Sequence, residues 1–232
     1  MEQDLSGRTC VVTGGTGALG SAVVARLHGA GARVLVPCFD VEELARFELR
    51  DADGVTTVEG VDLCDAKAVE AFYAQAGSLW ASIHIAGGFA YTPLEGLTAG
   101  DLEAQWRMNT LTATLCAQAA RRRMTGGGRM VNVTARPALD GSQGAALAAY
   151  ATSKAAVANL TELLAAELLE EGILVNAVAP SVIDTAANRA SMPDADHARW
   201  VAPGDLAEVI AFLVSPANRI LSGALLPCYG RA

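Results

Sequence analysis

Two residues of the chain, Tyr150 and Lys154, have side chains that could together carry acid–base chemistry, and they stand four positions apart. On a helix this spacing places both side chains on one face, so that a phenol and an ammonium share one neighbourhood. A nearby positive charge favours the phenolate and lowers the pKa of a tyrosine toward the working range of a general acid or base. The same pair is more often a packed ring beside a solvated lysine, so other motifs must decide between the two interpretations.

A glycine cluster near the N-terminus predicts a bound anion. The stretch VVTGGTGALGSAVV, residues 11–24, is typical of a strand, a tight turn and the start of a helix. Unpaired backbone N–H groups and the helix dipole point to the same place at such a turn, and both attract a phosphate. The spacing Gly15-x-Gly17-x-x-Gly20 also satisfies the dinucleotide-binding fingerprint. The alternative is a tight turn that binds nothing.

The elements that must position these residues alternate between strand and helix. Short runs rich in Val, Ile and Ala are followed by longer segments of helical period, which predicts a parallel sheet. We expect one domain over residues 1–232 with an α/β, Rossmann-type doubly wound fold, in which a seven-stranded, mainly parallel sheet carries helices on both faces. The predicted strands are TCVVT, RVLVP, VTTVEGVDL, WASIHIAGG, RMVNVTA, ILVNAVAP and GALLPC, and the predicted helices are SAVVARLHGAG, VEELARFEL, 101–123, 149–169 and 205–213.

Composition and charge bound the class of protein. With 232 residues, 52% of them hydrophobic and 18% charged, the chain can bury a large core. The net charge of -8 disfavours a nucleic-acid partner, because phosphate binding depends on clustered Lys and Arg. No apolar segment is long enough to span a membrane and the first residues lack the features of a signal peptide, so we expect a cytoplasmic protein. Five cysteines without a C-x-x-C spacing predict reduced, mostly buried thiols, and neither disulfides nor a metal site.

Several further motifs accompany the glycine cluster and the Tyr/Lys pair. These are VDL at 61–63, AGG at 86–88, an asparagine inside a predicted helix, VNVTA at a strand end, YATSK and VNAVAPSVIDT. In this order, and over essentially the whole chain, they resemble the short-chain dehydrogenase/reductase family. The resemblance implies a Rossmann-fold, NAD(P)-dependent oxidoreductase that interconverts a small-molecule carbonyl and an alcohol by hydride transfer. It also implies a homodimer or homotetramer assembled through the two long helices.

The resemblance assigns roles to particular residues. Tyr150 corresponds to the general acid/base, Lys154 to the residue that holds the nicotinamide ribose and lowers the pKa of the tyrosine, and Asn109 to the asparagine that positions a water. An acid/base beside the nicotinamide suffices for this chemistry without a metal. The positions that correspond to cofactor contacts are Gly14, Thr16, Gly17, Leu19, Gly20, Cys38, Phe39, Asp40, Asp62, Leu63, Ala86, Gly87, Gly88, Tyr150, Lys154, Pro180, Ile183 and Thr185.

Three departures from the family pattern concern packing around this site. Ala18 stands where compact members of the family have glycine, and it is small enough to keep helix and strand close. His84 stands at the first asparagine of the family's Asn-Asn-Ala-Gly motif, and we expect it to replace structural hydrogen bonds rather than to act in catalysis. Ser181 replaces the glycine that usually follows the family's proline, a change expected to narrow the cleft beside the nicotinamide.

A fourth departure concerns the reacting oxygen. The strand end VNVTA places Thr134 at the family's first serine and Ala135 at the second, catalytic one, which donates a hydrogen bond to that oxygen. Alternation along a strand sends these two side chains to opposite faces, so Thr134 replaces the donor only if the strand carries a bulge. Ser142 in the following loop is the other candidate donor. Losing the donor altogether would lower the rate about a hundredfold or more.

The end of the second predicted strand, RVLVPCFD, bears on the choice of cofactor. The acidic residue that binds the ribose of NAD is expected about 18 to 20 positions after the last glycine of the fingerprint, which spans Cys38 to Asp40. Phe39 stands where NADP-dependent members often have arginine, and Asp40 would repel a 2′-phosphate if it turned inward. We therefore expect NAD or NADP as the cofactor, with NAD favoured.

Two questions about function stay open at this point. The alternative to an enzyme is a nucleotide-binding protein without turnover that serves as a sensor or a partner subunit, although the retained Asn109, Tyr150 and Lys154 favour the enzyme. The segment AANRASMPDADHARWVA falls where the family has its substrate lid. Because it is short and polar, it predicts an open pocket and does not identify the substrate.

Overall fold

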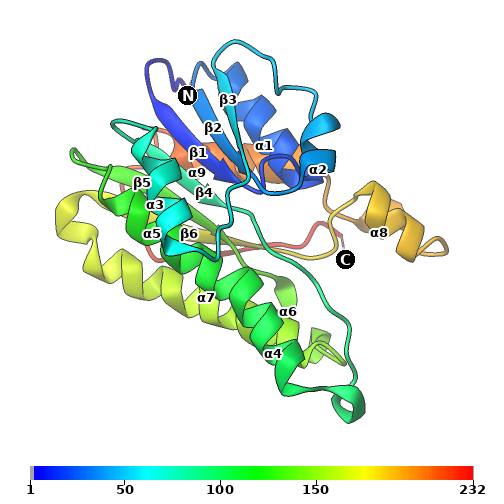
Figure 1. Cartoon of the computed structure of the whole chain (residues 1–232). Helices are drawn as coiled ribbons and strands as arrows, with labels where there is room; N and C mark the ends of the chain where they lie inside the picture. Colours follow the sequence, from blue (N-terminus) through cyan, green and yellow to red (C-terminus); the bar gives the residue numbers. More distant parts are fainter. Residues whose placement is uncertain (1–2, 232) are drawn as a thin grey trace.

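The computed structural model describes residues 3–231, so residues 1, 2 and 232 of the predicted domain lie outside the described part, and it contains a seven-stranded sheet (Figure 1). The strand order is β3-β2-β1-β4-β5-β6-β7, and all neighbouring strands are parallel. The order reverses between β1 and β4, where a crevice is expected at the carboxyl ends of the strands. The strands are β1 Thr9–Thr13, β2 Arg33–Cys38, β3 Val55–Glu59, β4 Ala81–His84, β5 Gly128–Val133, β6 Ile173–Pro180 and β7 Leu225–Cys228.

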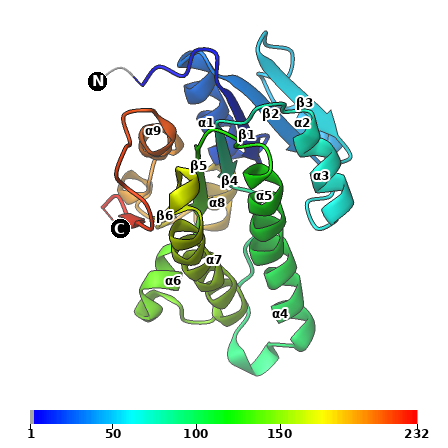
Figure 2. The ribbon, with the colours of Figure 1, turned by 90° about the vertical axis from the view of Figure 1, so that its left-hand side faces the viewer.

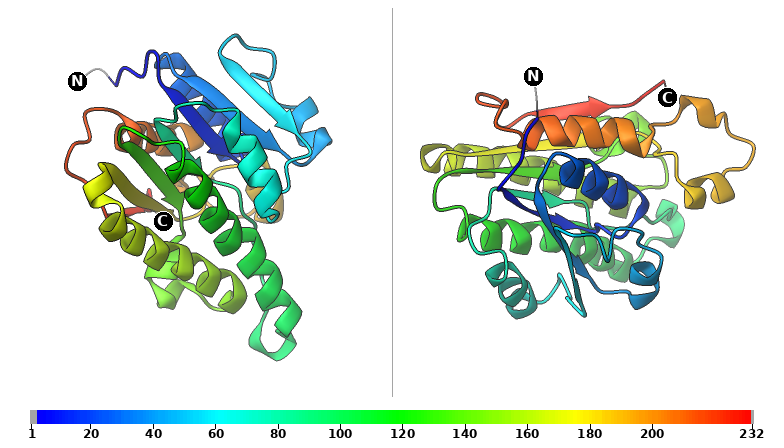
Figure 3. Two further views of the ribbon diagram at one scale, coloured as in Figure 1. Left: turned by 60° about the vertical axis from the view of Figure 1, so that its left-hand side comes forward. Right: turned by 90° about the horizontal axis from the view of Figure 1, so that it is seen from above.

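Helices cover both faces of the sheet (Figures 2 and 3). Helices α1 and α9 pack together on one face, and α3, α5 and α7 lie on the other. The predicted doubly wound α/β fold is confirmed. The helices are α1 Ala18–Gly29, α2 Val41–Ala45, α3 Ala66–Ala74, α4 Ala99–Gln105, α5 Thr112–Arg121, α6 Arg136–Leu139, α7 Ala148–Glu167, α8 Ala186–Ser191 and α9 Pro203–Val214.

Alternating side chains of the central strands form two cores. In β1, Cys10 and Val12 belong to the core beneath α1 and α9, whereas Val11 belongs to the core beneath α3, α5 and α7. Because both faces are covered, a central strand such as β6, ILVNAVAP, is buried at every residue and its sequence is almost entirely apolar. Packing on both faces fixes the carboxyl edge of the sheet, and with it the loops that carry the candidate site.

Several predicted elements differ in extent from the observed ones. The strands predicted over WASIHIAGG and RMVNVTA end at His84 and Val133, so Thr134 and Ala135 lie beyond the end of β5. The helix predicted over 101–123 consists of α4 and α5 joined by a π-helical turn over Trp106–Leu111. The helix predicted over VEELARFEL ends at Ala45, and the chain beyond it turns so that Phe47 is buried. The strand predicted over VTTVEGVDL ends at Glu59, because Gly60 adopts a positive φ of 72° that breaks the extended conformation.

Among the described helices, none is long and apolar enough to cross a membrane. Nor do the His, Cys, Asp and Glu residues within 3–231 form a group of three or more that could hold a metal ion. The five cysteines are free thiols, of which Cys10, Cys38 and Cys116 are buried.

Candidate active site

The glycine turn between β1 and α1 is packed against the end of the neighbouring strand. Gly14 has a positive φ of 66°, and a Cβ there would lie 2.8 Å from the amide nitrogen of Ala86. A side chain at Gly20 would overlap the carbonyl oxygen of Gly14. At Gly17, a Cβ would make only an ordinary contact of 3.4 Å. Close packing therefore explains why Gly14 and Gly20 have no room for a side chain. The backbone at Gly17, in contrast, lines a cavity and is open toward it.

That cavity has a volume of about 740 Å³ and opens at the carboxyl ends of β1, β2 and β4, where the strand order reverses. Its volume is within the range of small-molecule sites. Most of the predicted cofactor positions line it, namely Gly14, Thr16, Gly17, Leu19, Gly20, Cys38, Phe39, Asp40, Asp62, Leu63, Ala86 and Gly87. The remaining predicted positions, which do not line it, are Gly88, Tyr150, Lys154, Pro180, Ile183 and Thr185.

Two charged side chains that were not among the predicted positions, Glu43 and Arg107, also line the cavity. The Oε2 atom of Glu43, on α2, accepts a hydrogen bond of 2.9 Å from the hydroxyl of Thr16 in the glycine turn. Asp40 instead caps α2, because its Oδ1 accepts from the amide nitrogen of Glu42 at 2.8 Å. The carboxylate bound to the glycine turn is therefore that of Glu43. The spacing Asp40-x-x-Glu43 is a helix-start signal visible in the sequence.

Tyr150 and Lys154 lie near the start of α7. Lys154 is buried, and its Nζ donates a hydrogen bond of 2.9 Å to the carbonyl oxygen of Val133 at the end of β5. Burial lowers the pKa of Lys154 to about 8 and raises the pKa of Tyr150 to about 12. In this structure the ammonium of Lys154 is bonded at the strand end, and burial is the cause of the raised pKa of Tyr150, so the expected lowering of that pKa by Lys154 stays a prediction.

Asn109 is buried in the π-helical turn, and its side chain holds the backbone of Gly88. Its Nδ2 donates to the carbonyl oxygen of Gly88 at 3.1 Å, and its Oδ1 accepts from the amide nitrogen of Gly88 at 3.0 Å. The Nδ2 also donates to the Oγ of Ser153 on α7 at 3.0 Å. A Cβ on Gly87 would overlap the Asn109 side chain and lie 3.2 Å from the Nζ of Lys154. Asn109 and Lys154 therefore meet at Gly87, and π-helical turns are frequent at such functional positions.

The two hydroxyls considered as replacements for the family's catalytic serine are both engaged. The Oγ1 of Thr134, which is buried, donates a hydrogen bond of 2.6 Å to the carbonyl oxygen of Lys154. The Oγ of Ser142 donates to the Oδ1 of Asp140 at 2.6 Å in an exposed loop. Thr134 thus fastens β5 to α7 and has no second proton to donate. Ala135 is buried and immediately precedes α6.

The positions predicted for nicotinamide contacts follow the end of β6. Pro180 is the last residue of β6, and Ile183 pairs with Val201 in an isolated bridge. The Oγ of Ser181 donates a hydrogen bond of 2.8 Å to the carbonyl oxygen of Tyr229. The hydroxyl of Ser181 therefore fastens the end of β6 to the C-terminal segment.

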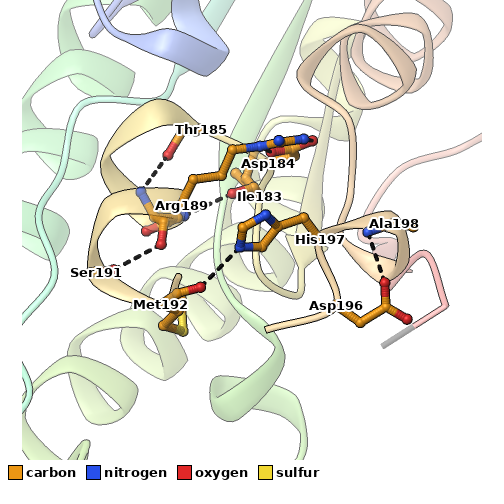
Figure 4. A network of polar contacts seen from close by, with 10 residues as sticks. Ile183, Asp184, Thr185, Arg189, Ser191, Met192, Asp196, His197 and Ala198 are labelled. Atoms are coloured by element: carbon orange, nitrogen blue, oxygen red, sulfur yellow. Dashed lines mark hydrogen bonds and ion pairs between the residues drawn. The ribbon is translucent and has the colours of Figure 1, made fainter. Parts of the chain in front are cut away.

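The predicted lid segment folds onto itself (Figure 4). Thr185 caps α8 through its hydroxyl. Arg189 forms an ion pair with Asp184, in which NH2 lies 2.7 Å from Oδ2, and the Nε2 of His197 lies 2.9 Å from the carbonyl oxygen of Met192. In Figures 1 and 3, α8 projects from the body of the protein. The segment therefore has internal contacts that hold its shape while it stands away from the sheet.

His84 belongs to a buried polar network, as expected from its place at the end of β4. Its Nδ1 lies 2.7 Å from the Oδ1 of Asn132, and its Nε2 lies 2.9 Å from the Oγ of Ser82. The Ser82 hydroxyl lies 2.8 Å from that of Tyr73, and the Nδ2 of Asn132 donates to the Oγ1 of Thr161 at 2.9 Å. Since Asn132 offers an acceptor here, the Nδ1 of His84 carries the proton and the neutral imidazole is satisfied.

Protonating this imidazole is costly, so we expect His84 to make the protein sensitive to acid. Burial lowers the pKa of His84 to about 4. The unfolded chain, with a pKa near 6.5, binds the proton first, so the free energy of unfolding falls as the pH drops from 6.5 toward 4. The expected loss is about 2 kcal/mol between pH 6.5 and pH 5.

Urea unfolding of wild type and His84→Asn at both pH values measures this difference. The His84→Asn protein is expected to lose less stability than the wild type between the two pH values. The control His28→Asn is expected to lose as much as the wild type, because His28 is half-buried outside this network, with its Nε2 2.8 Å from the carbonyl oxygen of Asp53. Equal slopes in wild type and His84→Asn would contradict the prediction.

Comparison with known proteins gives one family. A family model described as enoyl-(acyl carrier protein) reductase matches residues 15–228. The 4-formylbenzenesulfonate dehydrogenase of Comamonas testosteroni is 32% identical over 250 residues, which cover 98% of each chain. The cyclic-di-GMP-binding biofilm dispersal mediator protein of Escherichia coli is 30% identical over 227 residues, covering 95% of this chain and 94% of that one. The crystal structure of a blue fluorescent protein from a metagenomic library in complex with NADPH matches with a TM-score of 0.87 at 29% identity, over 98% of each chain. The chain therefore belongs to the short-chain dehydrogenase/reductase family and is an NAD(P)-dependent oxidoreductase of that family.

Proposed function

We propose that this enzyme interconverts a carbonyl and an alcohol in a small molecule, with Tyr150 as the general acid and base. One observation carries the proposal. Gly87 lines the cavity at the carboxyl edge of the sheet and also lies against Asn109 and Lys154. Lys154 therefore stands at one end of the space in which a dinucleotide would bind, on the helix that carries Tyr150 four residues earlier.

The residues of the cavity fit a nicotinamide dinucleotide. The glycine turn leaves the backbone at Gly17 open, and it leads into α1, a helix of 12 residues whose N-terminal N–H groups attract a phosphate. Asp62 and Leu63 line the same cavity and would contact the adenine, and Ala86 and Gly87 would contact the ribose side of the cofactor. When bound, the cofactor supplies or accepts the hydride.

The protein's own residues hold and move the proton. With a pKa of about 12, the phenol of Tyr150 is protonated at neutral pH and ready to donate to a carbonyl oxygen. The bond from Thr134 to the carbonyl oxygen of Lys154 and the bond from Asn109 to Ser153 hold α7 at two points near Tyr150. These contacts hold in place the helix that carries the phenol.

Oxidation of NADH and NADPH by the purified protein, followed with a panel of small aldehydes and ketones, tests the proposal. Turnover of a carbonyl is the expected result. The alternative, a nucleotide-binding sensor or partner subunit, is suggested by the relative named for binding cyclic-di-GMP. Binding of a nucleotide without turnover of any carbonyl, by either cofactor, would overturn the proposal in favour of that alternative.

We propose NAD as the preferred cofactor, because two carboxylates, those of Asp40 and Glu43, line the cavity at the end of β2. A carboxylate accepts hydrogen bonds from a ribose but repels a 2′-phosphate. Among the described residues that line the cavity, Arg107 is the single Lys or Arg, and it comes from the π-helical turn rather than from β2 or α2. Glu43 is held toward the glycine turn by its bond from Thr16.

Replacing Glu43→Gln is expected to weaken NAD binding about tenfold, which is the value of one hydrogen bond to a charged group. NADP binding is expected to become tighter, because a negative charge is removed. Calorimetric titration of both cofactors into the protein without substrate measures the two constants. Glu42→Gln is the matched control, since Glu42 is its neighbour on α2 and does not line the cavity. Tighter binding of NADP than of NAD by the wild type would overturn the preference.

We also propose a cytoplasmic homodimer or homotetramer without a nucleic-acid partner. Helices α4 and α7 pack side by side, and a groove of about 460 Å³ between them is lined in part by Leu102, Trp106 and Ala149. Leu102 and Trp106 are exposed, as is Leu163 further along α7. Large exposed apolar side chains on two adjacent helices favour self-association. Light scattering at micromolar concentration measures the molar mass, and a monomer would contradict the proposal.

A further inference from the structure

Phe89 contacts the ring of Tyr150 but is largely exposed to solvent, which is unexpected for a residue that only stabilises the fold. Its ring packs edge-to-face against the ring of Tyr150, with centroids 5.0 Å apart and an interplanar angle of 68°. Yet Phe89 is 65% exposed and belongs to neither core. Covering the apolar surface of a phenyl ring is stabilising, and the rest of the protein leaves most of the Phe89 ring uncovered. A bound molecule could cover it. Most of the surface of the ring stands open beside the proposed general acid.

The loop that carries this ring, residues 89–94, is tied to the start of α7, and we call it the aromatic loop. The amide nitrogen of Thr92 donates a hydrogen bond of 2.8 Å to the carbonyl oxygen of Ala146, just before α7. Ala146 has a φ of 59°, a left-handed conformation that residues with a side chain adopt rarely. A backbone bond to a strained turn keeps the aromatic loop beside the helix end that carries Tyr150.

We infer that Phe89 determines specificity and that the carbonyl of the substrate is attached to a flat, apolar ring. The inference rests on the proposed function, because it places the carbonyl oxygen at the hydroxyl of Tyr150. The Phe89 and Tyr150 rings are in contact, so a ring bonded to that carbonyl reaches the open part of Phe89. Aromatic rings attract one another in offset-stacked and edge-to-face arrangements, so a flat ring gains more there than a puckered one. Tyr91 is a second exposed aromatic residue of the same loop.

A pair of aldehydes of equal ring size, benzaldehyde and cyclohexanecarbaldehyde, separates a flat ring from a puckered one. Their ratio of kcat/KM is measured in wild type, Phe89→Ala and Phe89→Leu, with Leu94→Ala as the control because Leu94 is exposed in the same loop. In Phe89→Ala, the ratio of kcat/KM for benzaldehyde to kcat/KM for cyclohexanecarbaldehyde is expected to fall about tenfold, mainly because the KM for benzaldehyde rises. Phe89→Leu, which keeps an apolar side chain but has no ring, is expected to lose most of the preference for benzaldehyde as well. Leu94→Ala is expected to keep the wild-type preference.

A second measurement does not depend on turnover. Benzamide carries a flat ring and a carbonyl that is not reduced, and cyclohexanecarboxamide is its puckered counterpart. Calorimetric titration of each into the protein with bound NADH is expected to show tighter binding of benzamide, and loss of that difference in Phe89→Ala. Equal binding of the two amides by wild type, or an unchanged difference in Phe89→Ala, would overturn the inference while leaving the proposed function standing. If no carbonyl of the wider panel is turned over, the proposed function fails, and the amide titration then still decides whether Phe89 prefers a flat ring.

Discussion

Replacing Tyr150→Phe is expected to lower kcat about a thousandfold, because the phenolic proton is the one that reaches or leaves the substrate oxygen. The affinity for NAD is expected to stay within about twofold, because the hydroxyl of Tyr150 does not line the dinucleotide cavity. Within residues 3–231 this hydroxyl has no hydrogen-bond partner, so its removal leaves no buried group unsatisfied. The packing of the ring against Phe89 is kept in the variant.

Single-turnover rates with excess enzyme and calorimetric titration with NAD measure the two effects separately. Tyr229→Phe is the control, because Tyr229 contacts the protein through its carbonyl oxygen and the face of its ring, and that variant is expected to keep the wild-type rate. A kcat in Tyr150→Phe close to that of wild type would remove Tyr150 from the proposed mechanism. A parallel loss of NAD affinity would instead indicate that the phenol helps to bind the cofactor.

The parts of the fold that sequence predicts best are those set by local pattern. The apolar runs of β1 and β6 have to be strands buried on both faces, since each alternate side chain meets a different core. The glycine turn can also be predicted from its local sequence, because close backbone contacts around one strand–turn–helix unit require glycine at Gly14 and Gly20. Such contacts are close along the chain, so the residues that make them are visible in one short segment.

The features that sequence did not predict depend on contacts between distant segments. The pKa of Tyr150 is set by burial, and the Nζ of Lys154 is bonded 21 residues away at Val133, so helical spacing alone suggested a coupling that the structure does not show. The role of Glu43 depends on how α2 lies over the glycine turn, 27 residues earlier. The hydroxyl of Thr134 could be excluded as a donor only once its bond to α7 was known.

Replacing Ala135→Ser is expected to raise kcat/KM for a simple carbonyl by about tenfold to a hundredfold, the lower part of the value of one oxyanion donor. Ala135 directly follows Thr134, whose side chain is committed to α7. Both residues lie beyond the end of β5, but the backbone at Ala135 is still extended, so its side chain is expected on the other face. From the match to the family's strand end, we expect that face to meet the substrate oxygen. A donor there acts mainly on the transition state, so kcat rises more than KM falls.

The backbone conformation at Ala135 is compatible with serine. Ala135 is the N-cap of α6, with φ of -156° and ψ of 156°, the extended conformation in which serine is a preferred cap. The second residue of α6 is Pro137, which has no N–H, and the amide of Ala138 already donates to the carbonyl oxygen of Ala135 at 3.0 Å. A serine oxygen at position 135 would share that one donor, and its own proton remains free to donate to the substrate. The free energy of unfolding is therefore expected to stay within about 1 kcal/mol of the wild-type value. Steady-state kinetics and urea unfolding of Ala135→Ser measure both effects, with Ser142→Ala as the control expected to keep the wild-type rate. A higher stability without a higher rate would show that the hydroxyl caps α6 away from the substrate. A lower rate in Ser142→Ala would show that Ser142 leaves Asp140 during turnover and already supplies the donor.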